Sequence, residues 1–128
     1  MRKLKIVWQR LVSDNRTCPR CGSTERELER SVKKLKKAFA LLNIDVDLKK
    51  KKIGKAAFER DPMQSNILLI EGKPIEYWLS ADVGQSPCCD TCGDEECRTL
   101  ESEGRVYETI PEKLIIKACL IAAGKMIK

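Results

Sequence analysis

Residues 67–74 read Ile67-Leu68-Leu69-Ile70-Glu71-Gly72-Lys73-Pro74, four apolar residues followed by a polar turn. A short, continuously apolar run is typical of a central strand that is buried on both faces. Glycine supplies the backbone dihedral that a tight turn needs, so Glu71-Gly72 predicts a hairpin. We therefore expect two antiparallel strands here, the second a short one around Ile75, followed by a helix that starts at Glu76.

Upstream of this hairpin the sequence predicts a strand and a long helix. Residues Leu4 to Val12 form the strand, because apolar and polar side chains alternate along it. The helix begins at Ser23 or Thr24, where Thr24 and Glu27 match a capping box, and ends near Asn43. Its apolar residues recur every four or three positions and define one buried stripe: Leu28, Val32, Leu35, Phe39 and Leu42.

The remaining elements are predicted by similar patterns. Ile44 to Leu48 alternates between apolar and charged residues and forms a second strand with one solvated face. Gly54 to Arg60 is a short helix that Asp61-Pro62 ends. Residues 80–108 are irregular apart from a short hairpin across Thr99 to Tyr107, and a closing helix runs from Pro111-Glu112 to about Met126.

The order of these elements is strand, helix, strand, short helix, strand, strand, helix. The first crossover should make its two strands parallel, and the hairpin makes the last two antiparallel. This is the β-α-β-α-β-β-α order of thioredoxin and glutaredoxin, and a ferredoxin-like fold is the main competitor. A Cys-x-x-Cys motif after the first strand favours the thioredoxin-like fold. We thus expect one α/β domain over residues 1–128, with a cysteine-rich insertion at about 80–108 before the C-terminal helix.

The composition narrows the function classes. No run of apolar residues is long enough to span a membrane, and no secretory signal is recognisable, so we expect a cytoplasmic protein with no membrane partner. The chain is rich in Lys and Glu and has no His, which resembles the proteins of hyperthermophiles, whose cells keep intracellular disulfides. The net charge is +6, but the one dense run, Lys49 to Lys52, is interpreted as a solvated strand end or loop. Only six aromatic residues are present, which disfavours a nucleic-acid partner.

Seven cysteines are the most informative feature of a chain that can fold without them. Cys18 and Cys21 follow the first strand, and the loop from Gly84 to Cys97 follows a last strand that runs parallel to the first. Both groups should therefore lie at the same end of the sheet. We expect six cysteines to share one surface there: Cys18, Cys21, Cys88, Cys89, Cys92 and Cys97. Cys119 lies on the closing helix among apolar residues and is interpreted as a buried free cysteine.

The first hypothesis for this cluster is thiol–disulfide exchange. Cys18 would be the nucleophile and Cys21 the resolving thiol, stabilised as thiolates by the N-terminus of the following helix and by Arg20. No cofactor is needed, and the partner would be a protein or a low-molecular-weight thiol or disulfide. Gly22 places the predicted helix start after Cys21, which weakens this hypothesis. Trp78 either lines a substrate groove with Tyr77 or packs in the core, and we favour the core.

The second hypothesis is a non-enzymatic metal site. The sequences Cys18-Pro19-Arg20-Cys21-Gly22 and Cys89-Asp90-Thr91-Cys92-Gly93 share the pattern of a zinc knuckle. Cys18, Cys21, Cys89 and Cys92 would supply four thiolates for zinc or another thiophilic ion. Cys88 and Cys97 would be spare or would bind a second ion. Nucleic-acid binding through a zinc ribbon and the lysine run is a third and weaker alternative.

Three stretches carry a resemblance to a known family. They are residues Thr17 to Gly22, Asn66 to Pro74 with Trp78-Leu79, and Val83 to Asp94. Together they resemble an uncharacterised, cysteine-rich, thioredoxin-like family of prokaryotes that is classed as a domain of unknown function. The resemblance covers nearly the whole chain, and it implies a thioredoxin-like fold but no established activity.

Overall fold

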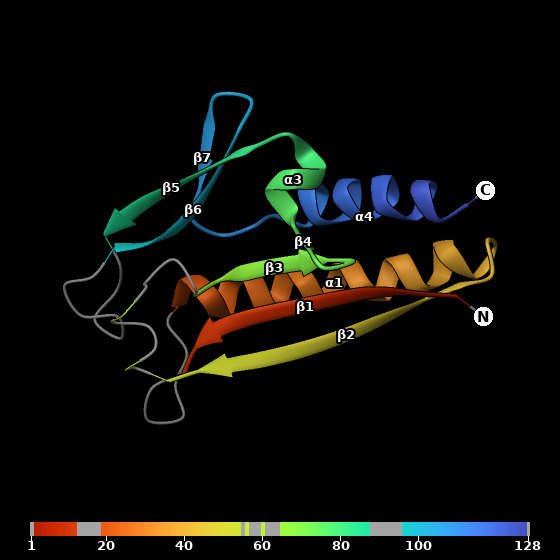
Figure 1. Cartoon of the computed structure of the whole chain (residues 1–128), viewed down its shortest axis with the longest axis horizontal. Helices are drawn as coiled ribbons and strands as arrows, with labels where there is room; N and C mark the ends of the chain where they lie inside the picture. The colour runs from red at the N-terminus through yellow and green to blue at the C-terminus, as the bar shows by residue number, and fades with distance from the viewer. Residues whose placement is uncertain are drawn as a thin grey trace.

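The computed structural model describes residues 2–12, 19–54, 56, 60, 65–87 and 96–127 (Figure 1). Within these residues the chain is mixed α/β, with a four-stranded sheet, a three-stranded sheet and three helices. The predicted short helix over 54–60 and its end at Asp61-Pro62 lie mostly outside the described residues. The expected mixture of strands and helices is therefore confirmed at the level of α/β class.

The larger sheet consists of β1 (Arg2–Leu11), β2 (Ile44–Ile53), β3 (Ile67–Ile70) and β4 (Lys73–Pro74) in the order β2-β1-β3-β4. The parallel pairing of β1 with β2 and the antiparallel hairpin of β3 with β4 confirm the sequence predictions. The predicted burial of β3 on both faces is wrong, because only Leu68 and Ile70 are fully buried.

The expected short last strand is present as β4, but Ile75 does not belong to it. Ile75 begins α3 (Ile75–Leu79), and β4 ends at Pro74, whose ψ of 153° marks the last extended residue. Proline has no backbone N–H to donate to a sheet, and it is well suited to precede a helix, so the strand stops there.

The long helix α1 (Pro19–Ala40) begins before Ser23 and ends before Asn43. Its buried stripe is confirmed at Leu28, Val32, Leu35 and Phe39. Leu42 is the exception, since it lies in the turn after the helix and is 49% exposed. Asn43 in this turn has a φ of 58°, a left-handed conformation that asparagine tolerates and that ends the helix.

The core lies on one face of the larger sheet. Leu4, Ile6 and Trp8 alternate along β1 and are fully buried, whereas Lys3 and Lys5 on the other face are exposed. The helix α1 packs on β2, and α4 (Glu112–Met126) contacts α1, β1 and β3. Cys119 is completely buried in α4, as predicted. The two helices and the sheet thus form two layers around a single apolar cluster.

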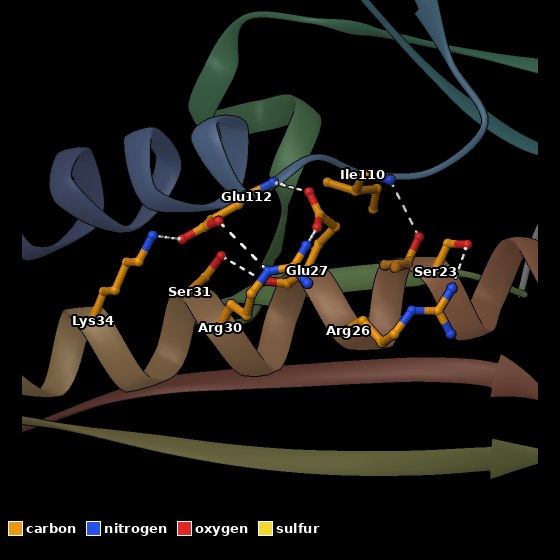
Figure 2. Close-up of polar contacts among 9 residues, drawn as sticks. Ser23, Arg26, Glu27, Arg30, Ser31, Lys34, Ile110 and Glu112 are labelled. Atoms are coloured by element: carbon orange, nitrogen blue, oxygen red, sulfur yellow. Dashed lines mark hydrogen bonds and ion pairs between the residues drawn. The ribbon is translucent and has the colours of Figure 1, made fainter.

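The N-terminal half of α1 is fixed to the start of α4 by two hydrogen bonds (Figure 2). The backbone N–H of Ile110 donates to Thr24 Oγ1 at 3.2 Å, and that of Glu112 donates to Glu27 Oε1 at 3.0 Å. The predicted capping box is therefore wrong, because α1 begins at Pro19 and these two side chains instead bind backbone N–H groups just before and at the start of α4. The carboxylate of Glu112 in turn pairs with Lys34 at 2.5 Å and with Arg30 at 3.7 Å.

The smaller sheet consists of β5 (Asp82–Pro87), β6 (Glu96–Ser102) and β7 (Arg105–Tyr107), all antiparallel. The β6–β7 hairpin confirms the predicted hairpin, but β5 was not expected in a segment interpreted as irregular. Gly84 explains why β5 fits: a Cβ there would lie 2.6 Å from Glu101 Oε1 and 2.9 Å from Thr99 Oγ1. Side chains of β6 lie over this residue, so any larger residue would require the side chains of Glu101 and Thr99 to shift.

The Thr24–Ile110 contact can be tested by Thr24→Val. The substitution keeps the shape of the side chain but leaves the N–H of Ile110 without an acceptor in a buried position. We expect the free energy of unfolding in urea to fall by about 1–3 kcal/mol. Thr24→Ser keeps the hydroxyl and should cost about 1 kcal/mol or less, the contribution of one methyl group. Equal losses in the two variants would contradict a role for the hydrogen bond.

Cys119 predicts a pH dependence of stability. Burial raises the pKa of its thiol from 9.0 to about 12, so the unfolded chain loses this proton first as the pH rises. The contribution of the protonated Cys119 thiol to the free energy of unfolding is constant below pH 9.0. It is lost between pH 9.0 and about 12, by about 1.4 kcal/mol per pH unit.

The measurement is the difference in free energy of unfolding between the wild type and Cys119→Ala. Below pH 9.0 this difference should not change with pH. Above pH 9.0 the wild type should lose stability relative to Cys119→Ala. A difference that does not change with pH would contradict the assignment.

Candidate functional site

The predicted site consists of six cysteines, and the structure describes the backbone of two of them. Cys21 lies in α1 and Cys97 in β6. Cys18, Cys88, Cys89 and Cys92 lie outside the described residues. The geometry of the site is therefore built from the elements that carry or flank these cysteines.

Cys21 is the third residue of α1, which begins at Pro19. The predicted helix start after Cys21 is wrong, and Gly22 lies inside the helix. Proline is favoured at the first helical position because its φ is already helical and its missing N–H would have no partner there. Glycine in a helix costs only about 1 kcal/mol, which is too little to move the start. The first turn of α1 contains no acidic residue, so this turn itself adds no carboxylate to the positive end of the helix dipole.

Cys97 is held in the ladder between β5 and β6. It pairs with Ser86, and Glu96 pairs with Pro87 at the end of the ladder. The segment 88–95, which contains Cys88, Cys89 and Cys92, therefore leaves and re-enters the smaller sheet at two neighbouring strand ends. Arg98, the residue after Cys97, forms a largely buried ion pair with Glu76 of α3, which attaches this part of β6 to the rest of the molecule.

A chain of hydrogen bonds joins the two sheets near these cysteines. Trp8 Nε1 donates to Asn66 Oδ1 at 3.1 Å, and Asn66 Nδ2 donates to the carbonyl of Glu108 at 3.4 Å. Ser86 Oγ donates to Glu108 Oε1 at 3.3 Å. These hydrogen bonds thus connect β1, which precedes Cys18, with β5, which precedes Cys88. This role of Asn66 and Glu108 was not predicted from the sequence, in which the one available signal is a polar Asn directly before an apolar strand.

The elements that flank both cysteine groups lie at the same end of the molecule. Figure 1 shows the ends of β1 and β2, the start of α1 and the start of β3 at that end, together with the end of β5 and the start of β6. This arrangement agrees with the predicted shared surface as far as the described backbone reaches. The contact between the cysteines themselves stays a prediction.

The lysine run is part of a strand. Lys49 to Lys52 lie in β2 and pair with residues 7–10 of β1, so the loop interpretation is wrong and the solvated strand is confirmed. Lys50 Nζ contacts Glu25 at 2.8 Å and Glu29 at 3.5 Å on α1. Partial burial lowers the pKa of Lys50, but the hydrogen bonds and charges of the two glutamates outweigh it and raise the pKa overall.

Trp78 packs in the core, as favoured from the sequence. Its indole is buried, and Nε1 donates to the carbonyl of Ile70 at 2.8 Å. Tyr77 is 49% exposed and accepts a hydrogen bond from Lys73 at 3.2 Å. This bond and the charges of Lys73 and Lys125 lower the pKa of Tyr77. Trp78 is therefore not available as the wall of a substrate groove.

Comparisons with known proteins place the chain among relatives without an assigned activity. No helix in the described ranges is long and apolar enough to cross a bilayer. No solved structure matches the chain. An uncharacterised protein of Archaeoglobus fulgidus is 40% identical over 113 residues, which cover 88% of this chain and 82% of that protein. A family model described as a domain of unknown function (DUF2703) matches residues 4–119. The chain therefore belongs to this family, as its resemblance to an uncharacterised prokaryotic family predicted.

Proposed function

We propose that the protein is a thiol-based redox protein that carries out thiol–disulfide exchange through Cys18 and Cys21. The observation that carries the proposal is the start of α1 at Pro19, because it puts Cys21 in the first turn of a 22-residue helix and Cys18 directly before that helix. Positive partial charge at a helix N-terminus stabilises a thiolate, which is the reactive form of cysteine. The main sequence argument against the redox hypothesis, a helix that starts after Cys21, no longer applies.

The topology of the larger sheet supports the same proposal. The order β2-β1-β3-β4 combines a parallel β1–β2 pair, joined by α1, with an antiparallel β3. This is the arrangement that we expect of a thioredoxin-like domain. In this proposal the β5–β7 sheet and the segment 88–95 form the cysteine-rich insertion before α4, and the protein acts in the cytoplasm.

The proposed reaction is a pair of exchange steps. The thiolate of Cys18 attacks one sulfur of a substrate disulfide, forms a mixed disulfide and releases the other sulfur as a thiolate. The thiolate of Cys21 then attacks the sulfur of Cys18, which releases the second substrate thiol and leaves a Cys18–Cys21 disulfide. The substrate disulfide is reduced and the protein dithiol is oxidised. A protein dithiol or a low-molecular-weight thiol must reduce the protein before the next cycle.

The alternative proposal is a closed metal site. Cys18, Cys21, Cys89 and Cys92 would bind zinc or another thiophilic ion in a tetrahedron, with Cys88 and Cys97 spare or binding a second ion. The observation that favours it is the β5–β6 ladder up to the Pro87–Glu96 pair. This pairing holds the two residues that flank segment 88–95 at neighbouring positions.

Two single substitutions separate the roles of Cys18 and Cys21. With a disulfide-bonded peptide as substrate and dithiothreitol as reductant, Cys18→Ser should abolish turnover, since no nucleophile remains. When the pre-reduced protein is mixed with the peptide in the absence of dithiothreitol, Cys21→Ser should retain the first step and accumulate a mixed disulfide at Cys18, which mass spectrometry of the acid-quenched reaction detects. Cys119→Ala is the matched control and should react as the wild type, because Cys119 is completely buried.

The same preparations decide between the two proposals. Protein purified without oxygen or chelator is dialysed, and its metal content is measured by mass spectrometry. Stoichiometric zinc that Cys18→Ser and Cys89→Ser both release would overturn the redox proposal and support the metal site. Metal-free protein that traps substrate at Cys18 would support the redox proposal and overturn the alternative.

A further inference from the structure

A cleft of about 410 Å³ lies between the β6–β7 hairpin and the first turns of α4. The hairpin contributes Ser102, Glu103, Arg105 and Tyr107 to its lining. The helix contributes Lys113, Leu114 and Lys117. A volume of this size is within the range of small-molecule binding sites.

Strand and helix geometry explain why these side chains converge. Arg105 and Tyr107 are two residues apart in β7 and therefore project from the same face of the strand. Val106 between them projects from the other face and is 60% exposed. Lys113 and Lys117 are four residues apart in α4 and share one face of the helix. The cleft thus lies between one face of β7 and one face of α4.

The charge in the cleft is not balanced. Three cations, Arg105, Lys113 and Lys117, line it together with one carboxylate, that of Glu103. In the part of the chain that the structure describes, no acidic side chain forms an ion pair with any of these three cations. By contrast, Arg30 and Lys34 on the neighbouring helix α1 both pair with Glu112. Three like charges around one cleft repel each other, so an anion that enters it lowers the electrostatic energy.

We propose that this cleft binds a small phosphate ester that carries a flat ring, such as a nucleoside monophosphate. The guanidinium of Arg105 can hold two phosphate oxygens at once, and the two lysines add point charges from the opposite wall. The ring of Tyr107 and the side chain of Leu114 offer an apolar surface on which a base can lie. The carboxylate of Glu103 accepts hydrogen bonds from ligand hydroxyl groups and repels a fully anionic ligand of larger charge.

The test is calorimetric titration of the full-length protein with AMP, with adenosine and with inorganic phosphate, at constant ionic strength. AMP should bind more tightly than either fragment. Arg105→Ala and the double variant Lys113→Ala/Lys117→Ala should each weaken AMP binding by about tenfold or more, the loss expected for charge-assisted hydrogen bonds. Lys33→Ala/Lys37→Ala is the matched control, because it removes the same charge from an exposed basic stripe on α1. Its affinity for AMP should be unchanged.

The outcomes are distinct. A control variant that loses as much affinity as the cleft variants would overturn the proposal in favour of unspecific attraction by the net charge of +6. Adenosine that binds as tightly as AMP would overturn the role of the phosphate, and phosphate that binds as tightly as AMP would overturn the role of the ring. Absence of AMP binding to the wild type would overturn the site. Circular dichroism of each variant verifies that the fold is intact.

Discussion

The burial of one face of β1 is the constraint on which the rest of this structure depends. Leu4, Ile6 and Trp8 are completely inaccessible to solvent, and burial of side chains of this size contributes about 1.5–3 kcal/mol each. Since β1 lies between β2 and β3, both neighbours take their register from it. Trp8 adds a polar requirement, because its indole N–H is buried and needs an acceptor. Asn66 meets this requirement from a left-handed backbone conformation with a φ of 58°.

The same asparagine also connects the larger sheet to the smaller one. The amide of Asn66 is oriented by Trp8 and donates with its nitrogen to the carbonyl of Glu108. The carboxylate of Glu108 accepts a hydrogen bond from Ser86, which is paired with Cys97 across the β5–β6 ladder. A tryptophan in the central strand is thus connected to the backbone position of Cys97, and no local sequence pattern contains that relation.

Sequence patterns predicted those elements whose stability comes from their own periodicity. The alternation in β1 and β2, the apolar stripe of α1 and the Gly72 turn all reflect local rules, and the structure contains each of them. Two of the failures share one cause, which is a partner distant in sequence. Thr24 and Glu27 look like a local cap, but they hold backbone groups 86 and 85 residues away. The strand β5 has little strand propensity and depends on β6, whose side chains pass over Gly84. For the candidate site, the sequence named the cysteines, but the start of α1 relative to Cys21 could not be derived from Gly22 alone.

The position of β2 affects how two copies of the protein can associate. The order of the larger sheet makes this ten-residue strand an edge, in the part of the chain that the structure describes. A long, flat edge is a template on which a second chain can continue the sheet. A copy that added its own β2 to this edge in a matching register would bring its four consecutive lysines close to Lys49 to Lys52, and the resulting repulsion opposes such growth. Lysines on an edge strand disfavour edge-to-edge pairing, and in β2 they do so without a proline in the strand.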